Sequence, residues 1–131
     1  MKPHRSNSFL TVPLLALLSI YIAGCAGYTV KPGADPAVVA AEAAQEQAVD
    51  VFDAFLKWER NNETVVSAEV HEWADFIREF GPGWIDEAAK ATRAYKAART
   101  DENLASLNAA KAVLDAVIAE ARRHIATKGA Q

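Results

Sequence analysis

The sequence predicts an all-α fold, a small antiparallel helical bundle of three long helices and one shorter helix, after an N-terminal signal segment and a short tether. Apolar residues recur at every third or fourth position through most of residues 36–128, which is the spacing of helices that bury one face. No segment alternates apolar and polar residues over a useful length, so strands are not expected. Connections of a few residues favour antiparallel packing of successive helices.

The composition limits the classes of function. The chain of 131 residues is long enough for one modest core, and 51% of its residues are hydrophobic, as in globular proteins. Its net charge of −3 gives no basic field for nucleic acid, so no nucleic-acid partner is expected. The single cysteine cannot form an intramolecular disulfide, and the CxxC and CxxCH motifs of zinc, redox and haem proteins are absent, so we expect no cofactor.

Residues 1–24 have the anatomy of a secretory signal peptide. Lys2 and Arg5 supply a basic start, and an uncharged apolar run follows over residues 9–24. Two small residues then precede the only cysteine of the chain. The motif resembles the lipobox of bacterial lipoproteins, with isoleucine where leucine is commonest: Ile22, Ala23, Gly24 and Cys25.

This resemblance implies that the protein is a lipoprotein. Lipoprotein signal peptidase would recognise Ile22, Ala23 and Gly24, and would cleave before Cys25 after diacylglycerol attachment to its thiol. The new amino terminus would then be acylated, and several acyl chains hold a protein at a bilayer essentially permanently. The expected location is the bacterial cell membrane or outer membrane, with the domain outside the cytoplasm. Ala26, where aspartate would favour inner-membrane retention, favours the outer membrane if the host has one.

An uncleaved membrane helix is the alternative for the N-terminal segment. Residues 8–30 carry no charge and are about long enough to span a bilayer. Pro13, Gly24 and Gly27 interrupt this run, and the small residues before the thiol are those of a cleavage site. We therefore expect a cleaved signal peptide over residues 1–24, with the lipidated cysteine and a tether over residues 25–35.

The helical bundle domain is expected over residues 36–128. Asp35 can cap the free amides of a first helix over residues 36–60, and Pro36 suits its first turn. A last helix over residues 101–127 follows Thr100-Asp101 and has basic residues near its carboxyl end. Both segments place apolar residues along one stripe.

Two further helices are expected between these, over residues 65–80 and 84–99. The first places apolar residues on one face: Val66, Val70, Trp73, Ile77 and Phe80. Gly81-Pro82-Gly83 predicts a turn between them, because glycine tolerates the left-handed closing conformation and proline cannot continue the helical hydrogen bonds.

Few residues form a pattern suited to chemistry. No nucleophile has an obvious base beside it, so no catalytic residues are assigned and the protein is not expected to be an enzyme. His71 and Asp75, and likewise Glu120 and His124, are four apart and could each face one metal ion. Such pairs are common by chance, and both histidines are expected among charged surface positions, so no metal site is assigned.

Charged residues form two strips. An acidic strip lies on the first helix and a basic strip on the third: Glu42, Glu46, Asp50 and Asp53, and Lys90, Arg93, Lys96 and Arg99. Solvated helix faces are the simpler interpretation of both. Docking strips are the alternative, and the basic residues could also rest on anionic lipid headgroups.

A dense group of aromatic residues is the remaining candidate for a ligand or partner patch: Trp58, Trp73, Phe76, Phe80 and Trp84. Core filling is the simpler interpretation, because the alanine-rich helices need bulky residues opposite them. The alternative is a ligand groove or partner patch near the predicted 81–83 turn.

These observations lead to two functional hypotheses. The first is a non-enzymatic, lipid-anchored helical protein of the cell envelope, whose partners are the membrane and an unknown envelope protein or surface. The alternative is a membrane-anchored bundle that binds a small molecule or a metal through the aromatic group or the His71 and His124 pairs.

The lipobox predicts that Cys25→Ser abolishes incorporation of radiolabelled palmitate in cells. Because the thiol is the lipid acceptor, the wild-type chain should be labelled, and an inhibitor of lipoprotein signal peptidase should cause its larger precursor to accumulate. Label that persists in the serine variant would contradict the assignment of Cys25 as the anchor.

Overall fold

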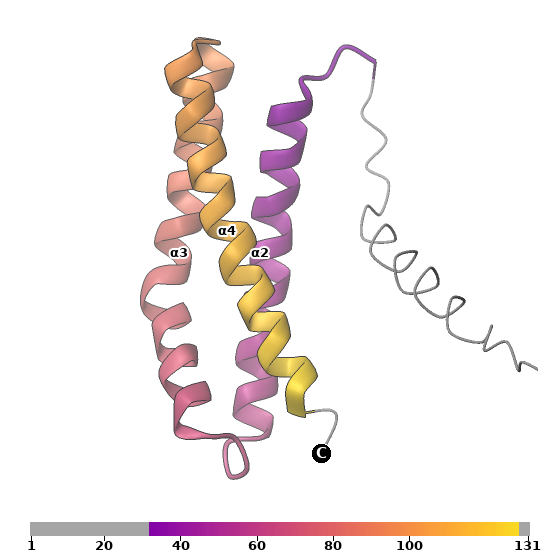
Figure 1. Ribbon diagram of the computed structural model, residues 1–131, viewed down its shortest axis with the longest axis vertical. Coiled ribbons are helices and arrows are strands. Elements are labelled where there is room, and N and C mark those ends of the chain that lie inside the picture. The colour runs from indigo at the N-terminus through magenta and orange to yellow at the C-terminus, as the bar shows by residue number, and fades with distance from the viewer. Residues whose placement is uncertain (1–31, 129–131) are drawn as a thin grey trace, which may run out of the picture. The chain divides into compact units, whose positions relative to one another are not determined.

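The computed structural model describes residues 32–128, which form three helices and no strand (Figure 1). They are α2 (Pro36–Asn61), α3 (Ala68–Ala97) and α4 (Asp101–Lys128). The predicted all-α fold is confirmed for this part of the chain. The predicted signal peptide and the predicted lipidation site at Cys25 lie outside the described residues, as does most of the predicted tether.

The ends of α2 agree with the sequence prediction and have identifiable caps. The Ala37 amide donates to Asp35 Oδ1 at 2.9 Å, and Pro36 occupies the first turn. At the carboxyl end the Asn62 side chain donates to the Trp58 carbonyl at 2.7 Å. These bonds satisfy backbone groups that a helix end leaves unpaired.

The predicted turn at residues 81–83 is wrong. Residues 68–97 form one continuous helix with Pro82 inside it, so the two expected helices are a single α3. Gly81 and Gly83 do not adopt the positive φ of a left-handed turn; in the described range only Gly33 has a positive φ. Proline removes one helical hydrogen bond, but packing on both sides of residue 82 outweighs this local cost. The described domain therefore has three helices where four were expected.

The core runs between all three helices, each of which packs against the other two. Its largest fully buried side chains come one each from α2 and α3 and two from α4: Phe55, Ile77, Leu107 and Leu114. Many other core positions are alanine, which lets the helices approach closely; Ala48, Ala74 and Ala121 are all fully buried. Residues 32–128 lie in one compact unit, and the core among these described residues draws on the three helices alone, so we expect this domain to fold by itself.

The arrangement of the helices follows from their short connections. α2 and α3 are joined by residues 62–67, and α3 and α4 by residues 98–100, so successive helices run antiparallel: in Figure 1 α2 runs down, α3 up and α4 down. At the second connection the Asn103 amide donates to Thr100 Oγ1 at 3.2 Å, which caps the start of α4. None of the three described helices is long and apolar enough to cross a membrane.

The two glycines of α3 provide a matched test of the continuous helix. A Cβ at Gly83 would meet nothing within 4 Å, whereas at Gly81 it would lie 3.2 Å from Phe52 Cδ2. Gly83→Ala should therefore raise the free energy of unfolding by about 0.5–1 kcal/mol, through helix propensity alone. Gly81→Ala should gain less or lose stability, because Phe52 is buried and must shift.

Thermal and chemical denaturation of both variants measure this difference. Equal stabilisation by the two substitutions would contradict the close approach of α2 and α3 at Gly81. Destabilisation by Gly83→Ala would contradict the helical conformation of residue 83.

Candidate functional site

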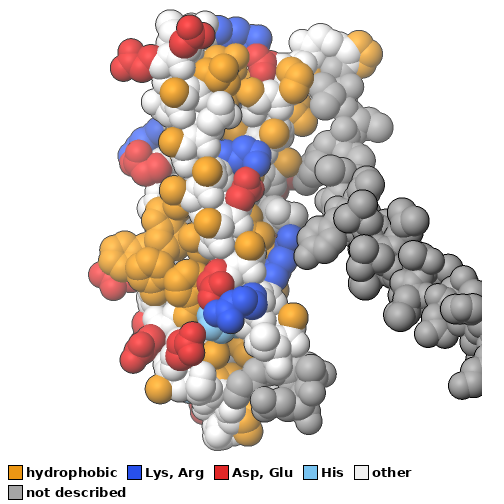
Figure 2. Space-filling view, viewed as in Figure 1, with side chains coloured by type: hydrophobic (Ala, Val, Ile, Leu, Met, Phe, Trp, Pro, Cys, Tyr) orange, Lys and Arg blue, Asp and Glu red, His pale blue; other side chains and the backbone are white. Residues whose placement is uncertain are grey.

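A row of aromatic side chains runs along α3, which we call the aromatic face: Trp73, Phe76, Phe80 and Trp84. Spacings of three and four residues place them on one side of the helix. Ring centroids lie 5.1 Å apart for Trp73 and Phe76, 5.0 Å for Phe76 and Phe80, and 6.1 Å for Phe80 and Trp84. Figure 2 shows a hydrophobic patch over α3, and these contacts make the row continuous.

The aromatic face is partly buried and partly open. Trp73 and Trp84 are half-buried against the core, and Trp84 meets the Phe52 ring edge-on at 6.4 Å. Phe76 and Phe80 keep 38% and 44% of their surface exposed. The expectation of core filling is therefore wrong for these two phenylalanines. Trp58 is separate from the row and packs beside Phe55 on α2, with centroids 5.9 Å apart.

A pocket of about 310 Å³ opens between α3 and α4, where it meets Trp73 and Phe76. We call it the α3–α4 pocket. Its remaining lining residues are three carboxylates and one histidine: Glu69, Glu72, Glu120 and His124. The pocket therefore combines aromatic surface with acidic groups, an arrangement that suits a positively charged group carried on an apolar stem.

The carboxylates of the pocket differ in their partners. Glu120 accepts hydrogen bonds from Arg123, which lower the pKa of Glu120 and keep it ionised at neutral pH. The pKa of Arg123 is raised, mainly by its hydrogen bond to Glu120 and to a smaller extent by the negative charge of Glu69. Neither Glu69 nor Glu72 forms an ion pair with another described residue. The pocket therefore has net negative charge, because Arg123 compensates only Glu120 by an ion pair.

His124 is a core residue, and the expectation that it lies at a charged surface position is wrong. It is 6% exposed, and its ring packs 6.0 Å from those of both Phe55 and Trp73. Its Nε2 lies 3.2 Å from Glu120 Oε1. In addition, the indole N–H of Trp73 is buried without an acceptor among the described residues, a desolvation cost of about 1–3 kcal/mol.

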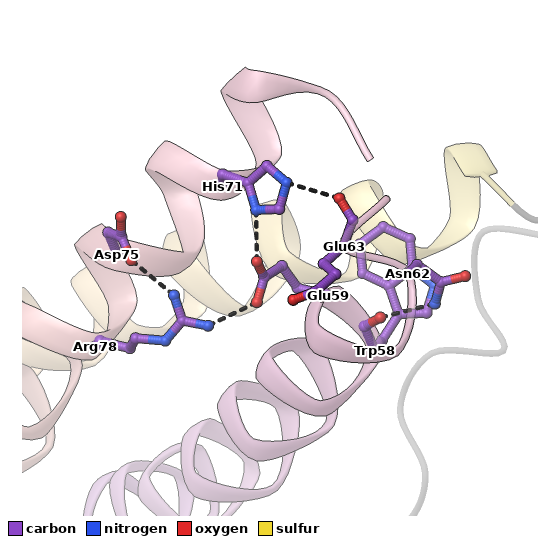
Figure 3. Close-up of polar contacts among 7 residues, drawn as sticks. All are labelled: Trp58, Glu59, Asn62, Glu63, His71, Asp75 and Arg78. Atoms are coloured by element: carbon purple, nitrogen blue, oxygen red, sulfur yellow. Dashed lines mark hydrogen bonds and ion pairs between the residues drawn. The ribbon is translucent and has the colours of Figure 1, made fainter. Parts of the chain in front are cut away.

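His71 and Asp75 do not converge on a shared ligand. His71 Nδ1 lies 2.6 Å from Glu59 Oε1, while Asp75 accepts from Arg78 at 2.7 Å (Figure 3). Arg78 also donates to Glu59 Oε2 at 2.6 Å. Among the described residues no group of three or more His, Cys, Asp or Glu is arranged to hold a metal ion. The pair on α3 therefore belongs to an ionic network between α2 and α3.

Glu59 is the centre of this network. Its side chain is only 6% exposed, whereas those of His71 and Arg78 are each 40% exposed. Partial burial lowers the pKa of Arg78, but hydrogen bonds from its guanidinium to Asp75 and Glu59 more than offset that effect and raise it overall. A buried carboxylate is costly unless it is paired, so Arg78 and His71 make the burial of Glu59 tolerable.

Most residues of the basic strip form ion pairs within the domain, and one of these pairs joins it to the acidic strip. Lys96 on α3 pairs with Glu42 on α2, and Arg99 donates to Asp35 at 2.7 Å. Lys90 pairs with Asp86 at 2.8 Å and with Glu87 at 3.0 Å. Most of the basic strip is thus committed to internal ion pairs, which favours its interpretation as a solvated face.

A second groove lies between α2 and α3 and has a volume of about 380 Å³. Its lining is largely apolar, with one acidic and one basic side chain: Val49, Phe52, Asp53, Leu56, Ile77, Arg78, Pro82 and Ile85. The charged groups are already paired, Asp53 with Lys57 and Arg78 with the Glu59 network. It offers an apolar surface but no unpaired charge to orient a ligand.

No protein-family model matches this chain, and no significant match to a curated protein or to a solved structure is found. Function is therefore inferred from the residues of the chain itself. The sequence identified the aromatic residues and Glu120 with His124, but it did not show that Glu69 and Glu72 join them in one pocket. Their four-residue spacing to Trp73 and Phe76 was the available signal.

The burial of Glu59 predicts that Arg78→Met destabilises the domain by about 2 kcal/mol, because the carboxylate keeps only His71 as a partner. This loss is smaller than the roughly 3–5 kcal/mol typical of breaking a fully buried ion pair, because the Arg78 guanidinium is partly exposed. Adding Glu59→Gln should recover part of the loss, since a neutral amide then replaces the buried charge.

Arg123→Met is the matched control, because it breaks the exposed pair with Glu120. Urea denaturation should show a much smaller loss for this variant than for Arg78→Met. Equal losses would contradict the special role of the buried carboxylate, and so would a failure of Glu59→Gln to rescue.

Proposed function

We propose that this chain is a lipid-anchored, non-enzymatic protein of the bacterial cell envelope that binds another protein through its aromatic face. Two features support the proposal. The motif that ends at Cys25 resembles a lipobox, and the domain carries a row of aromatic side chains on a single helix, of which Phe76 and Phe80 are exposed.

The exposed phenylalanines are the observation that carries the binding role. Soluble domains bury large aromatic residues when they can, and contiguous exposed aromatic surface marks interaction sites. Phe76 and Phe80 contact each other and Trp84, so they form one patch instead of scattered exposed residues. Aromatic residues are also enriched among those that dominate binding energy at protein interfaces.

The rigidity of the support favours protein binding as well. The two tryptophans at the ends of the row are half-buried against the core and hold the phenylalanines in place from below. A preorganised surface loses less side-chain entropy on association. The row lies in the middle of the longest described helix, so it does not depend on a loop for its shape.

A small-molecule binding bundle is the second candidate. The groove between α2 and α3, of about 380 Å³ and mostly apolar, is the observation that favours it. We rank it lower because that groove has no unpaired polar group to fix an orientation, and specific ligand sites combine apolar walls with a few such groups. Ligand binding there would raise the melting temperature of the domain.

Photocrosslinking in living cells tests the protein-binding role with the full-length chain. A photoreactive phenylalanine analogue in place of Phe80 should form a discrete crosslinked product with one envelope protein, identifiable by mass spectrometry. The same analogue in place of Glu46, on the exposed side of α2, is the matched control and should not form it.

Adding Phe76→Ala should reduce the yield from position 80 severalfold, because neighbouring aromatic contacts dominate such interfaces. Unchanged circular dichroism would show that the domain remains folded. Identical products from positions 80 and 46, or none from position 80, would contradict the proposal.

A further inference from the structure

The acidic residues beside the aromatic face indicate the chemistry of its partner, an inference that rests on the proposed protein-binding function. We propose that the aromatic face and the α3–α4 pocket together dock a basic amphipathic helix. Apolar side chains of that helix lie on Phe76 and Phe80, and one lysine or arginine enters the pocket.

The charge around the aromatic face favours a cationic partner. Glu69 lies four residues before Trp73, and Glu72 lies four before Phe76, so each carboxylate stands next to a ring of the row. Glu79 lies seven residues after Glu72 and therefore on the same edge of α3. All three are exposed and lack an ion-pair partner among the described residues.

The basic residues near the face do not balance these carboxylates. Lys90 is engaged by Asp86 and Glu87, and Arg123 is paired with Glu120 and has only a weaker electrostatic interaction with Glu69. The edge therefore keeps net negative charge, which a partner with lysine or arginine would complement. Charge complementarity of this kind sets specificity and raises the association rate.

The α3–α4 pocket is shaped for the end of a long basic side chain. It places Glu69, Glu72 and Glu120 around the exposed edge of the Trp73 and Phe76 pair. The methylene stem of lysine or arginine packs on aromatic rings, and its charged head can reach carboxylates at the rim. A lysine or arginine of the partner in this position would contact both the aromatic rings and the carboxylates of the pocket.

The dimensions of the face suit a short helix. Trp73 and Trp84 are eleven residues apart, which is about 16 Å along an α-helix and so about three turns. A helix lying in an apolar groove presents side chains at positions three and four apart. That spacing matches the aromatic row.

The same charges disfavour two other occupants. An anionic lipid surface would be repelled by the three unpaired carboxylates. A second copy of this chain would bring its own carboxylates to the interface, and several of its basic residues, among them Lys90, Lys96 and Arg99, are engaged in internal pairs. A basic peptide is the occupant that the site complements.

Isothermal titration calorimetry of the isolated domain, residues 32–131, with synthetic peptides measures the binding affinities that test the inference. The probe is an amphipathic peptide of leucine and lysine about four helical turns long. Its counterpart with glutamate in place of lysine should not bind, and a scrambled version without an apolar face should bind at least about tenfold more weakly, or ~1.4 kcal/mol.

Two charge variants provide a matched comparison. Glu69→Gln with Glu72→Gln should weaken binding of the lysine peptide about tenfold, because both carboxylates line the pocket. Glu46→Gln with Asp50→Asn removes the same charge from exposed positions on α2, and should change the affinity by less than about twofold. Circular dichroism and melting curves confirm that each variant is folded.

Three outcomes would overturn the inference. They are equal weakening by the two charge variants, equal binding of the glutamate peptide, and binding of the domain to vesicles of anionic phospholipid in preference to the lysine peptide. If Phe80→Ala weakens binding but substitution of the pocket carboxylates does not, the result supports protein binding at the aromatic face and contradicts a basic partner. Failure of the proposed function itself would appear separately, as loss of the crosslink from position 80.

Discussion

The continuity of α3 through Gly81, Pro82 and Gly83 is the constraint on which the rest of this structure depends. A helix that stopped at Phe80 would leave Trp84 on a separate segment with its own orientation. Because the helix continues, Trp84 falls in register with Trp73, Phe76 and Phe80, and the four rings form one row. The aromatic face is therefore a product of tertiary packing across a site where local sequence favours a break.

Packing at residue 81 explains why the helix does not break there. Gly81 is buried, and its missing Cβ lets α2 approach until Phe52 lies where a side chain would start. A proline inside a helix costs about 3 kcal/mol, which the burial of two or three large side chains is enough to offset. Gly81 thus serves here as a point of close helix approach, although a glycine-proline-glycine sequence elsewhere forms turns.

The sequence predicted those elements for which local pattern and tertiary packing agree. The apolar stripe and the Asp35 cap predicted the start and the buried face of α2, and the apolar stripe of residues 101–127 predicted α4 in the same way. The break in α3 and the surface position of His124 were predicted wrongly, because each depends on what a neighbouring helix covers. Periodicity within one helix shows which residues share a face, but it does not show which of them the neighbouring helices leave exposed to solvent. For that reason the exposure of Phe76 and the assembly of Glu69 with Glu120 required the three-dimensional arrangement.

The two polar features of the domain use acidic residues in opposite ways. Glu59 is buried and needs Arg78 and His71 as partners, so its charge joins α2 to α3 and is unavailable to a ligand. Glu72 is exposed beside an aromatic ring and forms no ion pair with another residue of the described part, so its charge costs little to maintain and remains available to a ligand. If lipid chains are attached at Cys25, the ten residues 26–35 can extend at most about 36 Å and would keep the domain near the bilayer. Anionic headgroups would then repel the acidic edge of α3 over roughly a Debye length, about 8 Å, and favour orientations in which the aromatic face points away from the lipid. The same carboxylates that select a basic partner would therefore also present the face to it.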